Sequence, residues 1–221
     1  MISLYDYYRS SAAYRVRIAL NLKGLDYRQL HVNLREGEQL HRAYRGLNAQ
    51  GLVPTLETED GQLLRQSLAI CEYLEEAYPQ PALLPAESSG RARVRALAQL
   101  IACDVHPLNN LRVHQYLEAE LGVSDDQQRA WYHHWVHEGF RALESMLAAG
   151  PQTGRFCLGE QPTLADLCLV PQVFNANRFG VDLGDYRNIR RINDACLEIE
   201  AFDRARPERQ PDALSGASTH S

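Results

Sequence analysis

The spacing of apolar and polar positions divides the chain into a first part with strands and a second part that is almost wholly helical. Residues 2–8 are β-prone, and apolar positions at helical spacing follow until Gly24. Residues 27–33 predict a second strand, and residues 38–47 predict a shorter helix. A strand, a helix, a strand and a helix in succession favour parallel pairing of the two strands.

A hairpin and a third helix complete the first part. Residues 53–58 and 62–65 flank an Asp60-Gly61 turn and predict two antiparallel strands, with Pro54 at the entry of the first. Ser67 is predicted to cap an amphipathic helix that ends before Pro79. The order βαβαββα is that of a thioredoxin-like α/β domain, which we assign to residues 1–80.

The second part predicts an all-α domain. The proline-rich and then polar residues 81–90 predict a linker. Helical periodicity follows over residues 91–120, 127–149, 163–177 and 189–204, so the helical domain is assigned to residues 91–210. Thr163 and Asp166 have the spacing of a capping box. The polar residues 211–221 predict a flexible tail.

The composition narrows the class of protein without indicating an activity. The 221 residues are 45% hydrophobic and 23% charged, as in ordinary globular proteins with one or two domains. A net charge of −5 gives no overall attraction for nucleic acid or for an anionic membrane surface. The N-terminus is too short and too polar for a signal peptide, and no apolar run could span a bilayer, so a cytoplasmic protein is expected.

Neither the cysteines nor the histidines predict a metal site. The five cysteines form no CxxC pair, and we interpret them as small buried apolar residues. His133 and His137 are one helical turn apart and could bind a metal from one face, but no HExxH motif or third ligand accompanies them. A histidine-rich surface, or a dimer contact, is the better interpretation.

Several local strings occur in the order typical of one known family. They are YYRSSAAYRVRIALNLKG, LVPTLETEDG, RQSLAICEYLEE, HPLNNLRV and TLADLCLVPQVFNANRFGVDL. Together they extend over nearly the whole chain, from Ser3 to Asp212, and resemble the zeta class of the glutathione transferases, the family that includes maleylacetoacetate isomerase. The resemblance implies a glutathione transferase fold, glutathione as the cofactor and a homodimer.

Ser10 and Ser11, at the start of the first helix, are the candidate catalytic and glutathione-binding residues. The first amides of a helix lack intrahelical partners and the dipole is positive there, so an anion such as a thiolate is stabilised. A hydrogen bond from Ser10 would lower the pKa of a bound glutathione thiol further. Without the resemblance, both serines would be interpreted as an ordinary helix cap.

The sequence departs from the family at the next two positions. The family motif usually reads Ser-Ser-Cys-Ser, whereas Ala12 and Ala13 stand here in the last two places. Because glutathione brings its own sulfur, we expect isomerase activity to survive, while chemistry that depends on the missing cysteine would be lost.

Four more residues of the first part are candidates for glutathione binding. Val53 could offer its backbone N–H and C=O to the cysteinyl part of the peptide, and the resemblance implies a cis bond to Pro54. Gln66 and Ser67 would receive the γ-glutamyl carboxylate at a helix start, unless they are only a cap. Gln39 would reach the glycyl end.

The resemblance also implies site residues in the helical domain. His106, Asn110 and Arg112 match positions that close the glutathione site, although His106 replaces what is often a glutamine. Arg178 matches the arginine that binds substrate, and Arg9 is the second candidate for a substrate carboxylate because arginine suits bidentate contacts.

The activity implied is a glutathione-dependent cis-trans isomerisation of 4-maleylacetoacetate to 4-fumarylacetoacetate in tyrosine and phenylalanine catabolism. The alternatives are maleylpyruvate isomerisation in gentisate breakdown and general glutathione transfer to small electrophiles such as α-halo acids. Outside enzymology, the fold could serve as a binding or assembly module. The expected partner is a small dicarboxylate, not nucleic acid or a membrane. Arg15 and Arg17 are expected to coat the exposed face of the first helix.

Overall fold

The computed structural model describes residues 1–215, which form two compact units. The first unit comprises Met1–Leu83 and the chain from Leu197 onward, and the second comprises Leu84–Cys196. The sequence placed residues 91–210 in one helical domain, so the two assignments differ after Leu197. Helical periodicity reports that a helix buries one face, but it does not report which unit covers that face.

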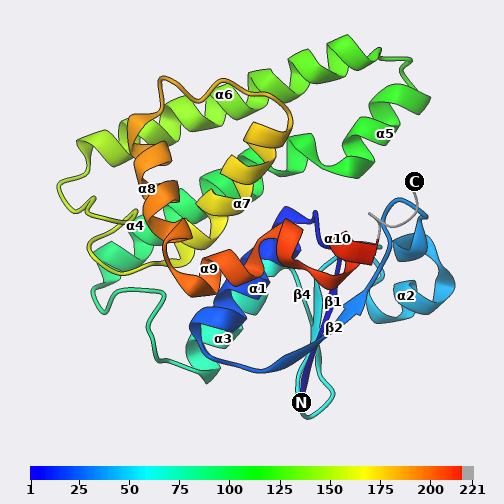
Figure 1. The fold of residues 1–221 in the computed structure, drawn as a ribbon, viewed down its shortest axis with the longest axis horizontal. Helices are drawn as coiled ribbons and strands as arrows, with labels where there is room; N and C mark the ends of the chain where they lie inside the picture. The colour runs from blue at the N-terminus through cyan, green and yellow to red at the C-terminus, as the bar shows by residue number, and fades with distance from the viewer. Residues whose placement is uncertain (216–221) are drawn as a thin grey trace. The chain divides into compact units, whose positions relative to one another are not determined.

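A four-stranded mixed sheet forms the centre of the first unit. Its strands are β1 (Ile2–Asp6), β2 (Tyr27–His31), β3 (Thr55–Glu57) and β4 (Leu63–Arg65), in the order β2-β1-β3-β4 (Figure 1). β1 is parallel to β2 and antiparallel to β3, and β3 is antiparallel to β4. Leu4 of β1 lies opposite Leu56 of β3, and both side chains are fully buried.

The helices of the first unit complete the predicted thioredoxin-like order. α1 (Ser11–Leu22) packs against α3 (Ser67–Ala77). α1 ends where Gly24 adopts a φ of 65° and the Leu25 N–H donates to the Leu20 carbonyl at 3.0 Å, a common helix termination. In place of one helix over residues 38–47, the structure has a 3-10 turn, η1 (Glu38–Leu40), and then α2 (Arg42–Leu47). The fold class is confirmed.

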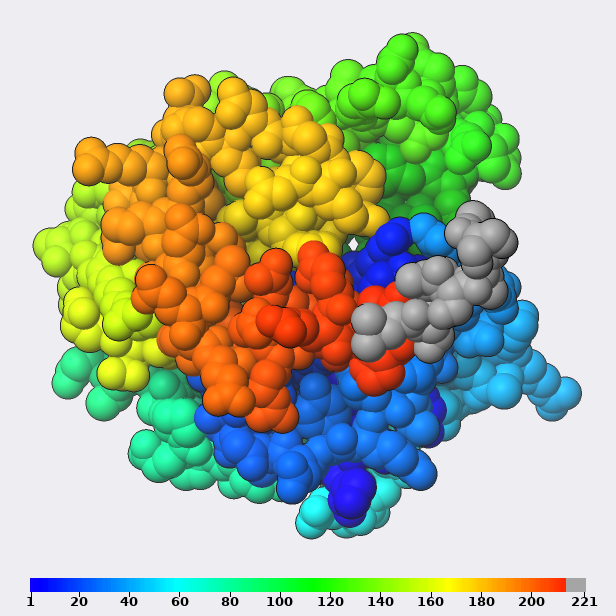
Figure 2. Space-filling view, viewed as in Figure 1, coloured from blue at the N-terminus to red at the C-terminus, as the bar shows by residue number. Residues whose placement is uncertain are grey.

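The C-terminal segment returns to the first unit. It contains α9 (Glu200–Ala205), the 3-10 turn η4 (Pro207–Arg209) and α10 (Pro211–Ser215), and α9 packs against α1. On the face shown in Figure 2, this segment, coloured red, lies against the blue N-terminal elements. The predicted tail of residues 211–221 is therefore helical at its beginning, and residues 216–221 lie outside the described residues.

The second unit is helical over its described length. Its α-helices are α4 (Ser88–Gln99), α5 (Leu111–Ala119), α6 (Asp125–Ala149), α7 (Leu164–Arg178) and α8 (Arg187–Leu197). The single helix expected over residues 91–120 is interrupted by a π-helical turn, η2 (Leu100–Val105), and a 3-10 turn, η3 (Pro107–Asn109). The predicted capping box is confirmed at α7, where the N–H and the hydroxyl of Thr163 both donate to Asp166 at 2.8 Å.

Two expectations about burial were wrong. Arg15 and Arg17 do not coat an exposed face, because their side chains are 2% and 0% exposed. Of the five cysteines, four are buried as expected, but Cys103 in the π-helical turn is exposed. Among the described residues, no helix is both long enough and apolar enough to cross a membrane.

Candidate functional site

Ser10 is the N-cap of α1, and its hydroxyl oxygen is an acceptor in the cap. Its backbone is extended, with φ −72° and ψ 116°, and its Oγ accepts a hydrogen bond from the Ala13 N–H at 3.2 Å. The Tyr14 N–H donates to the Ser10 carbonyl at 2.8 Å, which closes the first turn. Because Oγ is the acceptor in the cap, the hydroxyl proton remains available to a ligand.

The start of α1 is suited to an anion. Within this described helix, the first turn carries no acidic side chain, so the positive end of the dipole is not neutralised from within. Ser11, the first helical residue, is 3% exposed. Ala13 contributes its backbone N–H to the cap, and any residue would supply that group, which is consistent with an alanine at this position.

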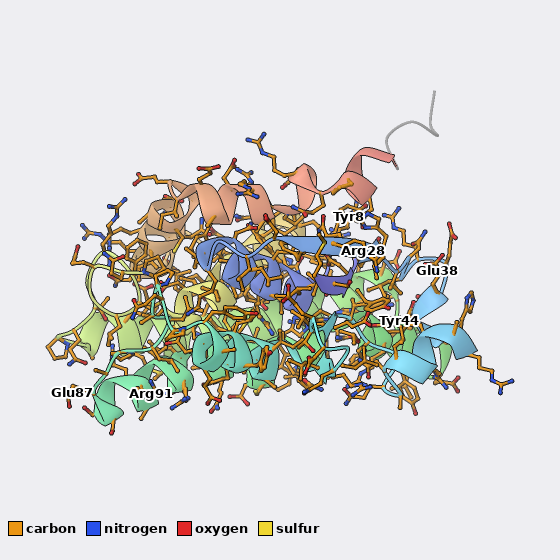
Figure 3. All side chains as sticks on the ribbon, turned by 90° about the horizontal axis from the view of Figure 1, so that it is seen from below. Tyr8, Arg28, Glu38, Tyr44, Glu87 and Arg91 are labelled. Atoms are coloured by element: carbon orange, nitrogen blue, oxygen red, sulfur yellow. The ribbon has the colours of Figure 1, made fainter. Side chains whose placement is uncertain are left out.

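A cluster of aromatic and apolar side chains joins the loop before Ser10 to other parts of the first unit. Tyr7, Val32, Tyr44 and Val53 are its buried members, and Tyr8 packs against it. Two of these rings, Tyr8 and Tyr44, are labelled in Figure 3. Burial and then the nearby Tyr8 raise the pKa of the Tyr7 phenol, so this ring is neutral at physiological pH. The cluster places the backbone of Val53 near the Ser10 loop.

Val53 and Gln39 present polar groups that no other described residue binds. The Val53–Pro54 bond is cis, as the resemblance implied. Among the described residues, no hydrogen bond engages the Val53 backbone N–H or carbonyl. Gln39 in η1 is 7% exposed, and its Oε1 has no hydrogen-bond partner there either. A bound peptide could satisfy these groups.

The start of α3 brings Ser67 close to a buried cation. Gln66 is the N-cap, with a φ of 70°, and Ser67 is the first residue of the helix, so the prediction that Ser67 caps α3 was wrong. The hydroxyl of Ser67 instead accepts from Arg15 Nη1 at 3.2 Å, while Gln66 Nε2 donates to Gln50 at 2.8 Å. Since Ser67 Oγ is an acceptor from Arg15, its proton is available to a carboxylate.

The second unit holds the other predicted site residues, and they have separate local roles. Asn110 is the N-cap of α5, and its Oδ1 accepts from the Arg112 N–H at 3.2 Å. The Arg112 side chain is exposed, and His106 ends the π-helical turn. Arg178 is the last residue of α7, with its guanidinium carbon 4.4 Å from the centre of the Phe179 ring. In the first unit, Arg9 stacks similarly on Tyr8 at 5.0 Å.

The histidine face of α6 is committed to contacts within the second unit. His133 Nε2 donates to the Phe179 carbonyl at 2.8 Å, and His137 Nδ1 lies 2.7 Å from the Tyr186 hydroxyl. Within the part of the chain that the structure describes, no three potential metal ligands gather. The two histidines therefore join α6 to the chain at and beyond the end of α7.

Comparisons with known proteins agree with this fold and these motifs. Residues 4–82 match the N-terminal domain of the glutathione S-transferases, and residues 128–198 match the C-terminal domain. The structure of a maleylpyruvate isomerase, described as a bacterial glutathione S-transferase of the zeta class, superposes with a TM-score of 0.93. The two sequences are 50% identical, over 95% of this chain and 99% of that one. The chain belongs to the zeta-class glutathione transferases.

Other relatives of this zeta-class transferase are named maleylacetoacetate isomerase. It is 50% identical over 213 residues to the maleylacetoacetate isomerase of Pseudomonas aeruginosa, which covers 96% of this chain and 98% of the relative. A maleylacetoacetate isomerase structure from Methylobacterium extorquens AM1, with bound malonate and glutathione, is 41% identical and superposes with a TM-score of 0.93. That match covers 95% of this chain and 98% of the other.

Sequence reasoning missed two residues beside the candidate site of this transferase. Arg15 was placed on the surface, yet it lies beneath the Ser67 hydroxyl. Asp212 was placed in a flexible tail, yet it accepts a hydrogen bond from the Tyr8 N–H at 2.9 Å. An available signal was the arginine pair on a helix whose other residues are mostly apolar. For Asp212, no local pattern indicates the contact.

Proposed function

We propose that this zeta-class transferase is a glutathione-dependent cis-trans isomerase that converts 4-maleylacetoacetate to 4-fumarylacetoacetate. The names of its relatives support the reaction. The observation that carries the proposal is the Ser10 hydroxyl, which caps α1 through its oxygen and keeps its proton for a ligand at the positive end of the helix. We further propose a cytoplasmic homodimer that acts in tyrosine and phenylalanine catabolism.

The residues of the first unit fit a glutathione molecule. The idle backbone groups of Val53 suit the cysteinyl amide and carbonyl, which would bind as an added strand. The buried Gln39 suits the glycyl end. Ser67 and Gln66, with the positive start of α3 and the Arg15 cation behind it, suit the γ-glutamyl carboxylate.

Ser10 and Ser11 prepare the site for chemistry. When bound, glutathione supplies a nucleophilic sulfur whose reversible addition to the cis double bond allows rotation before elimination. Ser10 donates its hydroxyl proton toward the sulfur position and, with the first amides of α1, favours the thiolate over the thiol. Ser11 adds a second hydroxyl at the same helix start.

The substrate is a small dicarboxylate, and the chain offers arginines for its two ends. We propose that Arg178 binds one carboxylate and that Arg9, beside Ser10, is the second candidate. His106, Asn110 and Arg112 are proposed to contribute to glutathione binding. A solved relative holds both glutathione and malonate, itself a small dicarboxylate.

Replacing Ser10 tests the proposal. Loss of a hydrogen bond to a charged sulfur costs about 1.5–3 kcal/mol, so Ser10→Ala should raise the pKa of the bound thiol by about one to two units. Ultraviolet absorbance of the thiolate measures that pKa, and Ser10→Thr, which keeps a hydroxyl, is the matched control. An Ala variant with wild-type turnover and an unshifted thiol pKa would remove Ser10 from the mechanism.

The substrate is decided by a parallel assay. Maleylacetoacetate and maleylpyruvate are each offered with and without glutathione, and product is detected with the appropriate hydrolase. Faster glutathione-dependent turnover of maleylacetoacetate supports the proposal. Preference for maleylpyruvate would assign the protein to gentisate breakdown, in line with its similarity to a Ralstonia maleylpyruvate isomerase, 50% identical over 212 residues.

A further inference from the structure

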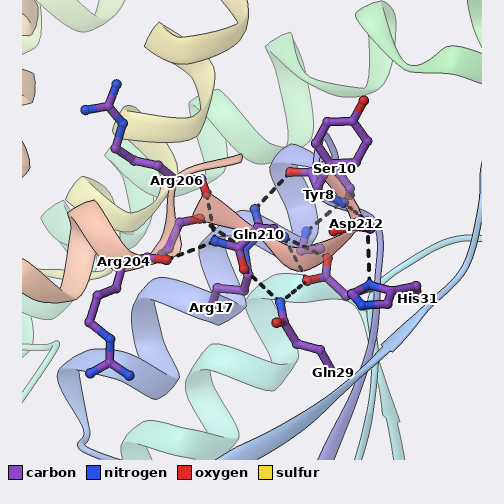
Figure 4. Close-up of polar contacts among 12 residues, drawn as sticks. Tyr8, Ser10, Arg17, Gln29, His31, Arg204, Arg206, Gln210 and Asp212 are labelled. Atoms are coloured by element: carbon purple, nitrogen blue, oxygen red, sulfur yellow. Dashed lines mark hydrogen bonds and ion pairs between the residues drawn. The ribbon is translucent and has the colours of Figure 1, made fainter. Parts of the chain in front are cut away.

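The loop between β1 and Ser10 is held by two side chains from outside the loop. The backbone N–H of Tyr8 donates to Asp212 Oδ2 at 2.9 Å, although the two residues are 204 positions apart (Figure 4). The backbone carbonyl of Tyr8 accepts from Arg17 Nη2 at 3.0 Å. Both backbone polar groups of Tyr8 are thus bound by charged side chains, which form stronger hydrogen bonds than neutral ones.

Asp212 is itself held in place. The Nδ1 atom of His31, at the end of β2, lies 3.5 Å from the same Oδ2. The other oxygen, Oδ1, is buried and has no hydrogen-bond partner among the described residues. The side chain is 16% exposed, so the contact with Tyr8 is largely shielded from water. A charged acceptor in such a position binds its donor more strongly than it would at an open surface.

Gln210 fixes the backbone just before Asp212. It is 3% exposed, and its Oε1 accepts from Gln29 Nε2 at 2.8 Å. Its own Nε2 donates to the carbonyls of Arg204 and Arg206, at 2.9 and 2.7 Å. Gln29 also donates to the buried Asp6 at 3.0 Å. The turn between α9 and α10 is therefore closed on itself and tied to the sheet, which sets where Asp212 can lie.

The position of Tyr8 affects that of Ser10 through the turn that joins them. The Ser10 N–H donates to the Tyr7 carbonyl at 2.8 Å and closes a turn with Tyr8 inside it. A shift of Tyr8 therefore changes the turn that sets the direction of the Ser10 hydroxyl. Errors of about 1 Å in the placement of a reacting group can cost about a hundredfold in rate.

We propose that Asp212 is a positioning residue for Ser10, acting through the Tyr8 backbone N–H. It fixes the turn before α1 so that the Ser10 hydroxyl meets the glutathione sulfur in one orientation. The assignment rests on the proposed role of Ser10. It extends the functional site to the C-terminal segment. In this role the Asp212 side chain contacts neither glutathione nor substrate.

Hydrogen exchange and thiol titration test the proposal together. Asp212→Ala should speed amide exchange at Tyr8 by about tenfold or more, since a hydrogen bond to a charged group is lost. It should also raise the pKa of the bound glutathione thiol and lower kcat by about tenfold, with a smaller change in KM. Asp212→Asn keeps an oxygen acceptor, so it should bring both the amide exchange rate at Tyr8 and the pKa of the bound thiol most of the way back to the wild-type values.

Glu208→Ala is the matched control. Glu208 is an acidic residue of the same segment, with a 57% exposed side chain that pairs with Arg206 at 3.6 Å. This variant should match the wild type in Tyr8 exchange and in the thiol pKa. Equal effects of Glu208→Ala and Asp212→Ala would mean that the segment acts only through general stability, which would overturn the proposal.

The readouts separate failure of this proposal from failure of the proposed function. Asp212→Ala with wild-type exchange at Tyr8 and an unshifted thiol pKa overturns the positioning role while the isomerase assignment stands. A wild-type protein that binds no glutathione overturns the proposed function, and with it the role of Asp212 in catalysis. Exchange at Tyr8 in the ligand-free protein then still decides whether Asp212 holds the loop.

Discussion

The stability of the first unit depends strongly on the buried ion pair of Arg17 with Asp6. The two side chains are 0% and 1% exposed, and Arg17 Nη1 lies 2.8 Å from both carboxylate oxygens. Arg17 also donates to the backbone carbonyls of Ala205, at 3.0 Å, and of Tyr8. One guanidinium thus joins β1, the Ser10 loop and α9.

Arg17→Met should be strongly destabilising. It leaves the Asp6 carboxylate buried, with Gln29 as its remaining side-chain donor among the described residues. Removing one partner of a buried pair costs about 3–5 kcal/mol. For a chain of this size, that corresponds to a fall in Tm of about 6–20 °C. Equilibrium urea unfolding measures the free energy directly.

A double variant separates the cost of the orphaned charge from the loss of packing. Asp6→Leu with Arg17→Met removes both charges, and it should recover part of the stability that Arg17→Met alone loses. The recovery should be incomplete because two backbone carbonyls also lose their donor. A loss below about 1 kcal/mol in the single variant, or a double variant less stable than the single one, would refute this reasoning.

Three further predictions concern single residues. Cys103 should be the one cysteine that a thiol reagent labels rapidly in the native protein, and Cys103→Ser should abolish that labelling; fast labelling that persists would contradict the described burial. Burial raises the pKa of Tyr27 to about 12. The unfolded phenol therefore loses its proton first, and stability should fall as the pH rises from 10 toward 12, by at most about 2–3 kcal/mol. Tyr27→Phe should flatten that fall in urea titrations at several pH values. Asp166→Ala should cost about 3 kcal/mol or more, because the Cys157 N–H and both the N–H and the hydroxyl of Thr163 lose their acceptor; an unchanged urea midpoint would contradict it.

Local patterns in the sequence predict the elements that local interactions decide. The helix at Ser10, the stop at Gly24, the hairpin and the Thr163 capping box all follow from side chains and backbone groups within a few residues of one another. The order of the first elements then indicates the thioredoxin-like fold. The same reasoning identified the start of α1 as suited to an anion.

Features decided by distant contacts could not be predicted this way. An arginine on a helix is usually exposed, and only the fold shows that Asp6 lies beneath Arg17. The helix expected over residues 91–120 has continuous periodicity, although Pro107 marks a place where it could break. The return of the chain after Leu197 depends on which surface of α1 remains uncovered, and periodicity carries no information on that.

The division of the first unit between the two ends of the sequence has a consequence for biosynthesis. Met1–Leu83 emerges from the ribosome before the second unit, but the partners that it needs after Leu197 are made only after the whole second unit. The second unit can fold while translation continues. Arg17 and the Tyr8 N–H, in contrast, gain their hydrogen-bond partners only when α9 and Asp212 have been made. A nascent chain arrested before Ala205 should therefore remain sensitive to protease in its N-terminal part, even though all of the proposed glutathione-binding residues have already been translated.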